Sequence, residues 1–435
     1  MAVFHALGLP LLLFYRNPIL YVINIIEECA MNEPIARAMA KHISQGNMAG
    51  AVTLIWRNGR LVHKASQGQR NLAAGLPMES DTLFRVASLT KPVTSVAAMM
   101  LVEEKRIALD DPISRWVPEF STLNVLRAID GPCDDVEPAQ QEITVEDLLT
   151  HRAGFTYGDF HTGPIAAAYA EALGASIDSE HSPDSWMARL ASLPLVAQPG
   201  AGFHYGHSTD LLGFLLARIE GMPLQDLLRR RIFEPLGMVD TDFTVSVAKR
   251  HRCAAPLGFS ADGRPAQRAM VPAGHALQER PVGMSYVSGG QGLWSTADDY
   301  LAFARVFVEG GAVDGVRLLQ PETVHRMMTN RLSPAQRDEA RMFGLPIFAT
   351  GHGFGLGVAV VVEPDKAVPT LCGGGVGAIG WPGAYGGWWQ ADPNDSSVAI
   401  FLTHNMVDAD QMASGVGLGV YAAISDFQAM APMAD

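Results

Sequence analysis

Cysteine is scarce in this chain, since only Cys29, Cys133, Cys253 and Cys372 occur among 435 residues. Thiols so few and so scattered exclude a disulfide-stapled scaffold and a cysteine-rich zinc site. Positive charge is also low, because 32 Lys and Arg stand against 45 Asp and Glu and leave a net charge of −13. A chain without a basic field lacks what a phosphate backbone binds, so we expect no nucleic-acid partner.

Long hydrophobic runs are missing after residue 30, so we expect no stable membrane span there. Residues 6–26 are apolar, but two prolines and Arg16 interrupt them, and the longest clean stretch is too short to cross a bilayer as a helix. A secretory signal would begin with Lys or Arg and end in small residues, and neither feature is present. We interpret residues 1–30 as an N-terminal extension or leader, with Met31 starting the domain. This predicts a cytoplasmic protein, or a periplasmic or membrane-associated one if 1–30 are a genuine leader.

Apolar residues make up 48 % of the chain and charged residues 18 %, which is enough to bury a large core. Asn58-Gly59 between two β-rich runs, 51–57 and 60–64, predicts a hairpin because both residues tolerate positive φ. Further strands are expected at 354–362, 370–372, 387–391 and 397–403. Helices are expected at 33–46, 89–105, 143–150, 184–193, 208–220, 223–232 and 414–430, with irregular chain at 121–142 and 154–183.

Strands at both ends with helices between them indicate an α/β (α+β) fold: an antiparallel sheet flanked by helices, plus an inserted, mainly helical domain. We assign 31–86 and 283–435 to the sheet domain and 87–282 to the helical one. An active site is expected between the two.

Ser88-Leu89-Thr90-Lys91 lies where an extended segment enters a helix. Residues three apart share a helix face, so Lys91 can reach the Ser88 hydroxyl. Burial and the positive helix end both lower the pKa of a lysine, which lets it act as the base that a serine nucleophile needs. Backbone N–H groups left free at the helix start are suited to bind an oxyanion. A plain N-cap serine would show the same pattern.

Two further segments have a plausible chemical role. Tyr205 precedes the helix at 208–220 and is placed to relay a proton, although a lone tyrosine in a loop is usually a packing residue. The stretch 380–387, which contains Trp381, Gly383 and Ala384, is rich in small residues that let a substrate lie against a strand edge. A glycine-rich turn between strands is the simpler interpretation.

Two other patterns are weaker. Gly206–Asp210 half-matches the nucleophile elbow, but Asp210 replaces the small residue that the elbow needs. Gly375–Gly380 matches a dinucleotide-binding pattern without a helix to follow it, so we predict a loop. The 13 histidines show no metal-binding spacing, and we expect no metal and no cofactor.

Taken in this order, the motifs resemble the serine β-lactamase and penicillin-binding-protein family, in its class C β-lactamase-like branch, and the family VIII carboxylesterases best of all. The resemblance spans about 45–425 and rests on Phe84–Pro92, Leu148–Gly154, Leu236–Thr241 and Gly289–Tyr300. It implies Ser88 as the nucleophile, Lys91 as its base, Tyr205 as the proton shuttle, and the Ser88 and Ala384 N–H groups as the oxyanion hole.

Two positions depart from the β-lactamase pattern. His207 stands where β-lactamases carry Asn, and Trp381-Pro382-Gly383 replaces Lys-Thr-Gly. The missing lysine normally recognises a substrate carboxylate, so anionic β-lactams are poor candidates. We assign His207, Trp381 and Gly383 to substrate binding, with His207 either lining the pocket or acting as a hydrogen-bonded neighbour.

The sequence therefore predicts a serine hydrolase that cleaves short-chain esters of small molecules through an acyl-enzyme on Ser88, with weak β-lactam hydrolysis as a side activity. The alternatives are a β-lactamase, a D-amino-acid peptidase or amidase, a transacylase, and a non-catalytic penicillin-binding sensor. The oligomeric state is open.

Overall fold

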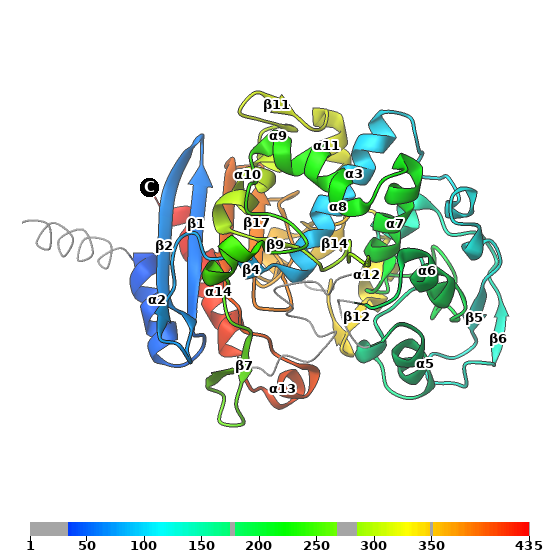
Figure 1. Cartoon of the computed structure of the whole chain (residues 1–435), viewed down its shortest axis with the longest axis horizontal. Helices are drawn as coiled ribbons and strands as arrows, with labels where there is room; N and C mark the ends of the chain where they lie inside the picture. Colours follow the sequence, from blue (N-terminus) through cyan, green and yellow to red (C-terminus); the bar gives the residue numbers. More distant parts are fainter. Residues whose placement is uncertain (1–33, 175–178, 268–284, 349–350, 435) are drawn as a thin grey trace, which may run out of the picture.

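An eight-stranded sheet built from both ends of the chain forms the centre of the molecule (Figure 1). The computed structural model describes residues 34–174, 179–267, 285–348 and 351–434. The strand order is β14-β15-β16-β17-β18-β1-β2-β3, and every neighbouring pair is antiparallel. The strands are β1 (Gly50–Arg57), β2 (Arg60–Asn71), β3 (Leu76–Pro77), β14 (His352–Phe354), β15 (Ala359–Val361), β16 (Ile379–Gly380), β17 (Trp388–Asp392) and β18 (Ser397–Leu402).

The predicted hairpin at Asn58-Gly59 is confirmed, with φ of 48° and 84° at the two turn residues. Side chains alternate between the two faces of the sheet, as the period of a strand requires. Trp388 and Phe401 pack under α2 (Pro34–Ser44) and α14 (Gly419–Met430). Trp389 and Ile400 belong to the main core on the opposite face, where α10 (Ala297–Val308) covers β17, β18 and β1. The predicted α/β fold of a helix-flanked antiparallel sheet is therefore confirmed.

The middle of the chain is mainly helical and lies to the right of the sheet in Figure 1. Helix α3 (Thr90–Glu103) crosses between the two parts, and it is buried almost all round. The other helices of this region are α4 (Val145–Leu149), α5 (Pro164–Leu173), α6 (Pro183–Ala191), α7 (Ser208–Glu220), α8 (Leu224–Leu228) and α9 (Glu234–Leu236), with a π-helical turn at Arg229–Phe233. The domain limits that we assigned stay a prediction.

Smaller elements complete the described chain. Short strands outside the main sheet are β4 (Phe84–Arg85), β5 (Asn124–Leu126), β6 (Val136–Pro138), β7 (Leu257–Phe259), β8 (Pro265–Gln267), β9 (Trp294–Ser295), β10 (Ala312–Val313), β11 (Val316–Arg317), β12 (Arg341–Met342) and β13 (Leu345–Pro346). The remaining α-helices are α11 (Pro321–Met327), α12 (Pro334–Glu339) and α13 (Ala409–Ser414).

Two strand predictions need correction. The run 354–362 contains the end of β14, a turn and then the strand β15, because the glycines between the strands turn the chain: Gly357 has a φ of 93°, and a Cβ there would lie 2.1 Å from Ser95 Oγ. Residues 370–372 form no ladder, because side chains take their polar groups. The Cys372 carbonyl pairs with His352 Nε2 at 2.8 Å, and Trp388 Nε1 donates to the carbonyl of Leu371.

Two predicted boundaries also need correction. The segment 154–183, which is predicted to be irregular, contains helix α5, which its alanine-rich sequence and first-turn proline favour. The helix predicted at 414–430 begins only at Gly419, as α14, because Gly415 and Gly417 adopt positive φ and separate it from α13, which ends at Ser414. Residues 1–30, with the predicted leader, lie outside the described residues. Within the described ranges, no helix combines the length and apolar character of a membrane span.

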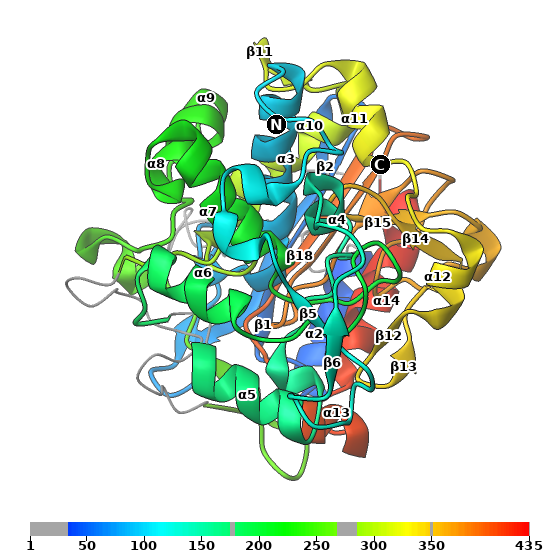
Figure 2. The ribbon, with the colours of Figure 1, turned by 90° about the vertical axis from the view of Figure 1, so that its right-hand side faces the viewer.

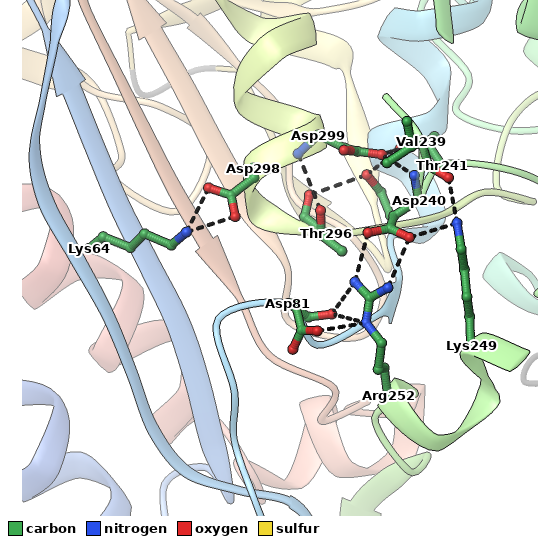
Figure 3. A network of polar contacts seen from close by, with 11 residues as sticks. Lys64, Asp81, Val239, Asp240, Thr241, Lys249, Arg252, Thr296, Asp298 and Asp299 are labelled. Carbon is green, nitrogen blue, oxygen red and sulfur yellow. Dashed lines mark hydrogen bonds and ion pairs between the residues drawn. The ribbon is translucent and has the colours of Figure 1, made fainter. Parts of the chain in front are cut away.

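A polar network joins the helical part to the sheet domain (Figure 3). Arg252 donates to both carboxylate oxygens of Asp240, at 3.0 and 2.7 Å, and to the carbonyl of Asp81. Asp299, at the start of α10, accepts from the Asp240 N–H at 2.7 Å and from Thr241 Oγ1 at 2.9 Å. The Leu236–Thr241 stretch is therefore held against α10, which in turn packs on the sheet.

Candidate active site

Ser88 lies in a tight turn between β4 and α3. A 3₁₀ turn at Ala87–Leu89 leads directly into α3, so the Ser88 N–H falls in the first turn, where no intrahelical partner exists. Ala87 is buried and has a φ of 46°, a conformation that costs energy for a residue with a side chain. Long-range bonds hold the turn, since the Val86 N–H donates to the Leu293 carbonyl and Tyr300 Oη donates to that of Leu89.

Lys91 lies one turn after Ser88 and is 0 % exposed. Its Nζ is 3.2 Å from Ser88 Oγ, 3.2 Å from Tyr157 Oη and 3.0 Å from the Gly290 carbonyl. Burial lowers the pKa of Lys91 to about 7, although the negative charge of Asp210 acts in the opposite direction. A large fraction of the amine is therefore neutral near pH 7, with its lone pair free to take a proton.

Tyr205 approaches Ser88 from the loop before α7. Its Oη donates to Ser88 Oγ at 2.7 Å and accepts a hydrogen bond from Trp381 Nε1 at 3.0 Å. Lys91 Nζ lies 4.5 Å from the centre of the Tyr205 ring. Burial raises the pKa of Tyr205, so the phenol keeps its proton until another group removes it. The predicted residues Ser88, Lys91 and Tyr205 are thus brought together.

Sequence reasoning missed a second set of polar groups behind Lys91. Asp210, in the first turn of α7, is 1 % exposed and accepts from Ser288 Oγ at 2.5 Å and from the Gly290 N–H at 3.0 Å. Gly290 thereby links Asp210 to Lys91, because its carbonyl accepts from Lys91 Nζ. Hydrogen bonds from His207 and Ser288 and the charge of Lys91 offset the cost of burial and lower the pKa of Asp210.

Tyr157 is the other missed residue. It comes from the segment 154–183, which is predicted to be irregular, and no local pattern singles it out. Burial raises the pKa of Tyr157 well above its usual value, so its hydroxyl stays protonated beside Lys91.

The sequence carries a weak signal for Asp210. It lies three residues after His207, on the same helix turn, and is therefore within hydrogen-bonding reach of that side chain.

The loop 381–387 lies against the Ser88 turn. A Cβ on Gly383 would come within 2.7 Å of the Val86 carbonyl oxygen and 2.9 Å of Leu89 Cδ1, so only glycine allows this approach. The Gly383 N–H donates to the Gly387 carbonyl at 2.7 Å. Ala384 is exposed, and its N–H makes no hydrogen bond within the part of the chain that is described. An unpaired N–H is what an oxyanion donor needs, and the pairing of the Ser88 and Ala384 N–H groups in an oxyanion hole stays a prediction.

Two of the predicted substrate-binding residues lie deeper than expected. Trp381 is 1 % exposed, and its indole is bonded to Tyr205. His207 Nδ1 is 3.0 Å from Asp210 Oδ2, and its ring packs among Tyr157, Tyr169 and Trp186. His207 therefore has the contacts of a hydrogen-bonded neighbour, and its part in substrate binding stays a prediction.

The dinucleotide-binding pattern has no helix to complete it. Residues 375–380 form a turn and then β16, with no helix in the described stretch that follows. In the described ranges, no group of three or more His, Cys, Asp and Glu is arranged to hold a metal ion.

Comparison with known proteins gives one family. A family model described as Beta-lactamase matches residues 35–418. Protein Rv1367c of Mycobacterium tuberculosis is 43 % identical over 374 residues, which cover 86 % of this chain and 90 % of that protein. Esterase EstB of Burkholderia gladioli is 33 % identical over 382 residues, covering 83 % and 87 %. The solved structure of EstCE1, "a hydrolase with promiscuous acyltransferase activity", aligns with a TM-score of 0.72 at 25 % identity over 92 % of this chain and all of that one.

Proposed function

The chain belongs to the beta-lactamase family, and from that premise we propose that it hydrolyses short-chain carboxylic esters through an acyl-enzyme on Ser88. It is a serine hydrolase of the beta-lactamase fold. The proposal rests on the position of Lys91 and Tyr205, which both lie within hydrogen-bonding distance of the Ser88 hydroxyl oxygen. Lys91 Nζ lies 3.2 Å and Tyr205 Oη 2.7 Å from Ser88 Oγ.

In the proposed first half-reaction, neutral Lys91 takes the Ser88 proton as Oγ attacks the ester carbonyl. A base with a pKa about 7 combines a large neutral fraction with enough basicity to accept that proton. The Ser88 and Ala384 N–H groups hold the oxyanion of the tetrahedral intermediate, and each such donor lowers the barrier by roughly 3 kcal/mol.

Tyr205 then passes a proton to the departing alkoxide. Its raised pKa keeps the phenol protonated, and the proton that Lys91 took from Ser88 then replaces the one that Tyr205 gives up. In deacylation the same groups act in reverse on a water molecule, which releases the carboxylic acid and restores the Ser88 hydroxyl.

Esters are preferred over β-lactams and D-amino-acid peptides because of Trp381. A lysine at this place would attract a substrate carboxylate, whereas the Trp381 indole offers no cation and donates its one N–H to Tyr205. The similarity to Esterase EstB supports the same choice.

A transacylase is the second candidate, favoured by the similarity to EstCE1, a hydrolase with promiscuous acyltransferase activity. The two activities share the acyl-enzyme and differ in its acceptor. An alcohol would replace water in the second half-reaction, and the same Tyr205–Lys91 pair would take the alcohol's proton.

A substrate panel tests the proposal. We expect the wild-type protein to turn over 4-nitrophenyl acetate and butyrate faster than nitrocefin or a D-alanyl peptide, and the Ser88→Ala variant to lose this activity. Ester turnover no better than that of the lactam or peptide would contradict the esterase. Acylation of Ser88 without turnover, seen by mass spectrometry, would indicate the non-catalytic sensor instead. Faster ester consumption on adding an alcohol, with a new ester as product, would identify a transacylase.

A further inference from the structure

Three two-residue hairpin turns in this chain share one backbone conformation. The central residues are Asn58-Gly59, with φ of 48° and 84°, Asp314-Gly315, with 48° and 86°, and Phe343-Gly344, with 52° and 75°. Positive φ at both positions is what a type I′ turn requires, and Asn or Asp followed by Gly is its usual sequence. The first two turns follow this rule, and the third places a bulky aromatic residue where Asn or Asp belongs.

Phe343 is therefore strained, and such strain persists where the rest of the structure requires it. The turn joins β12 to β13, on the right-hand side of Figure 2 below α12. Local contacts hold the hairpin, since the Ile347 N–H donates to the Ala340 carbonyl at 3.2 Å. None of these local contacts requires an aromatic side chain at the turn, because Asn would adopt the same backbone conformation with less strain.

The ring of Phe343 extends toward the catalytic tyrosine. Its centre lies 4.3 Å from that of Phe160, and Phe160 stacks on Tyr205 at 5.9 Å with 21° between the planes. Tyr205 is buried, but Phe160 and Phe343 are both only half-buried. Two aromatic rings from distant parts of the chain thus extend the Tyr205 surface outward, with part of each ring still exposed.

We propose that Phe343 and Phe160 form an apolar wall that binds the alcohol portion of the ester. The inference rests on the proposed function, in which Tyr205 protonates the departing alkoxide. The alkoxide oxygen then lies at Tyr205 Oη, and the group attached to it can pack along the rings that continue from the tyrosine. The substrates favoured are esters of short acids with bulky apolar or aromatic alcohols.

Ethyl acetate and 2-phenylethyl acetate test this wall, because they share an acyl group and have similarly basic leaving groups. Acetate release, followed by pH-stat titration, gives kcat/KM for each. We expect wild type to prefer 2-phenylethyl acetate, and Phe343→Asn to lower the ratio of the two kcat/KM values about tenfold, as loss of a buried aromatic contact predicts. Since Asn relieves the strain, the melting temperature of this variant should rise by about 1–2 °C.

Asn58→Phe is the matched control. It places the same residue in the same kind of turn at the tip of the β1–β2 hairpin, where Asn58 is exposed. It should lower the melting temperature and leave the selectivity ratio as in wild type. If Phe343→Asn has the same ratio of kcat/KM values as wild type, the proposed apolar wall is wrong, and the proposed esterase activity still stands. If the wild-type protein releases acetate from neither ester, the proposed esterase activity is wrong, and the apolar wall that rests on it is wrong as well.

Discussion

Replacing Asp210 by Asn is expected to move the pH dependence of acylation toward acid. Among the residues that the structure describes, Asp210 is the charged group that raises the pKa of Lys91 against the effect of burial. Asn keeps the shape of the side chain, and its oxygen can still accept from Ser288 and the Gly290 N–H. The substitution therefore removes a charge and leaves the hydrogen-bonded frame of Lys91 in place.

The size of the shift follows from the electrostatics of the site. In wild type, kcat/KM should rise with pH and reach half its plateau near the Lys91 pKa of about 7, because only the neutral amine can accept the Ser88 proton. An opposite charge close by typically changes a pKa by 1–3 units. Asp210 reaches Lys91 through Gly290 rather than by direct contact, so we expect a fall of about one unit, or about 1.4 kcal/mol. The plateau should also drop several-fold, since a less basic amine is a weaker catalyst.

The measurement is kcat/KM for 4-nitrophenyl acetate from pH 5 to 9, corrected for spontaneous hydrolysis. Asp299→Asn is the matched control, because Asp299 is also a mostly buried carboxylate that accepts a backbone N–H and a hydroxyl, but in the network of Figure 3. It should cost stability and leave the midpoint unchanged. An Asp210→Asn midpoint that stays at the wild-type value or rises would refute the electrostatic argument for Lys91.

The remaining predictions concern the Tyr205 side of the site. Tyr205→Phe removes the hydroxyl bonded to Ser88 and should slow ester turnover about 10²–10⁴-fold, so near-normal stopped-flow rates would remove Tyr205 from the proton path. Trp381→Phe keeps an aromatic ring but loses the indole bond to Tyr205, worth about 1 kcal/mol, and should lower kcat about fivefold while KM holds; a change in KM alone would make Trp381 a substrate contact instead. Gly383→Ala should destabilise the fold by about 1–3 kcal/mol in urea, because its Cβ would meet the Val86 carbonyl; unchanged stability with full activity would mean that the loop yields freely.

Local patterns in the sequence were enough for the parts of the fold and site that depend on neighbours along the chain. The Asn58-Gly59 hairpin follows from the backbone freedom of two adjacent residues. The approach of Lys91 to Ser88 follows from helix geometry. The antiparallel sheet was predictable in outline, because β1 and β18 are mostly apolar runs of 8 and 6 residues.

Residues that reach the site only through tertiary contacts could not be predicted from local sequence patterns. Tyr157 is 66 residues from Lys91, and the Gly290 carbonyl that binds the amine is 199 residues away. The Tyr205 contact came from the family resemblance, because a tyrosine before a helix carries no signal of its own. The strand predicted at 370–372 was wrong for the same kind of reason, since distant side chains take its backbone groups.

The most direct test of the account is to find which residue carries the acyl group during turnover. The protein is mixed with 4-nitrophenyl acetate, quenched with acid within the first turnovers and digested, and its peptides are mapped by mass spectrometry. The account predicts one acetyl group on Ser88 in wild type and none there in Lys91→Ala, with the variant still folded by circular dichroism. Steady ester hydrolysis with Ser88 unmodified, or equally rapid acetylation of Ser88 in Lys91→Ala, would contradict it.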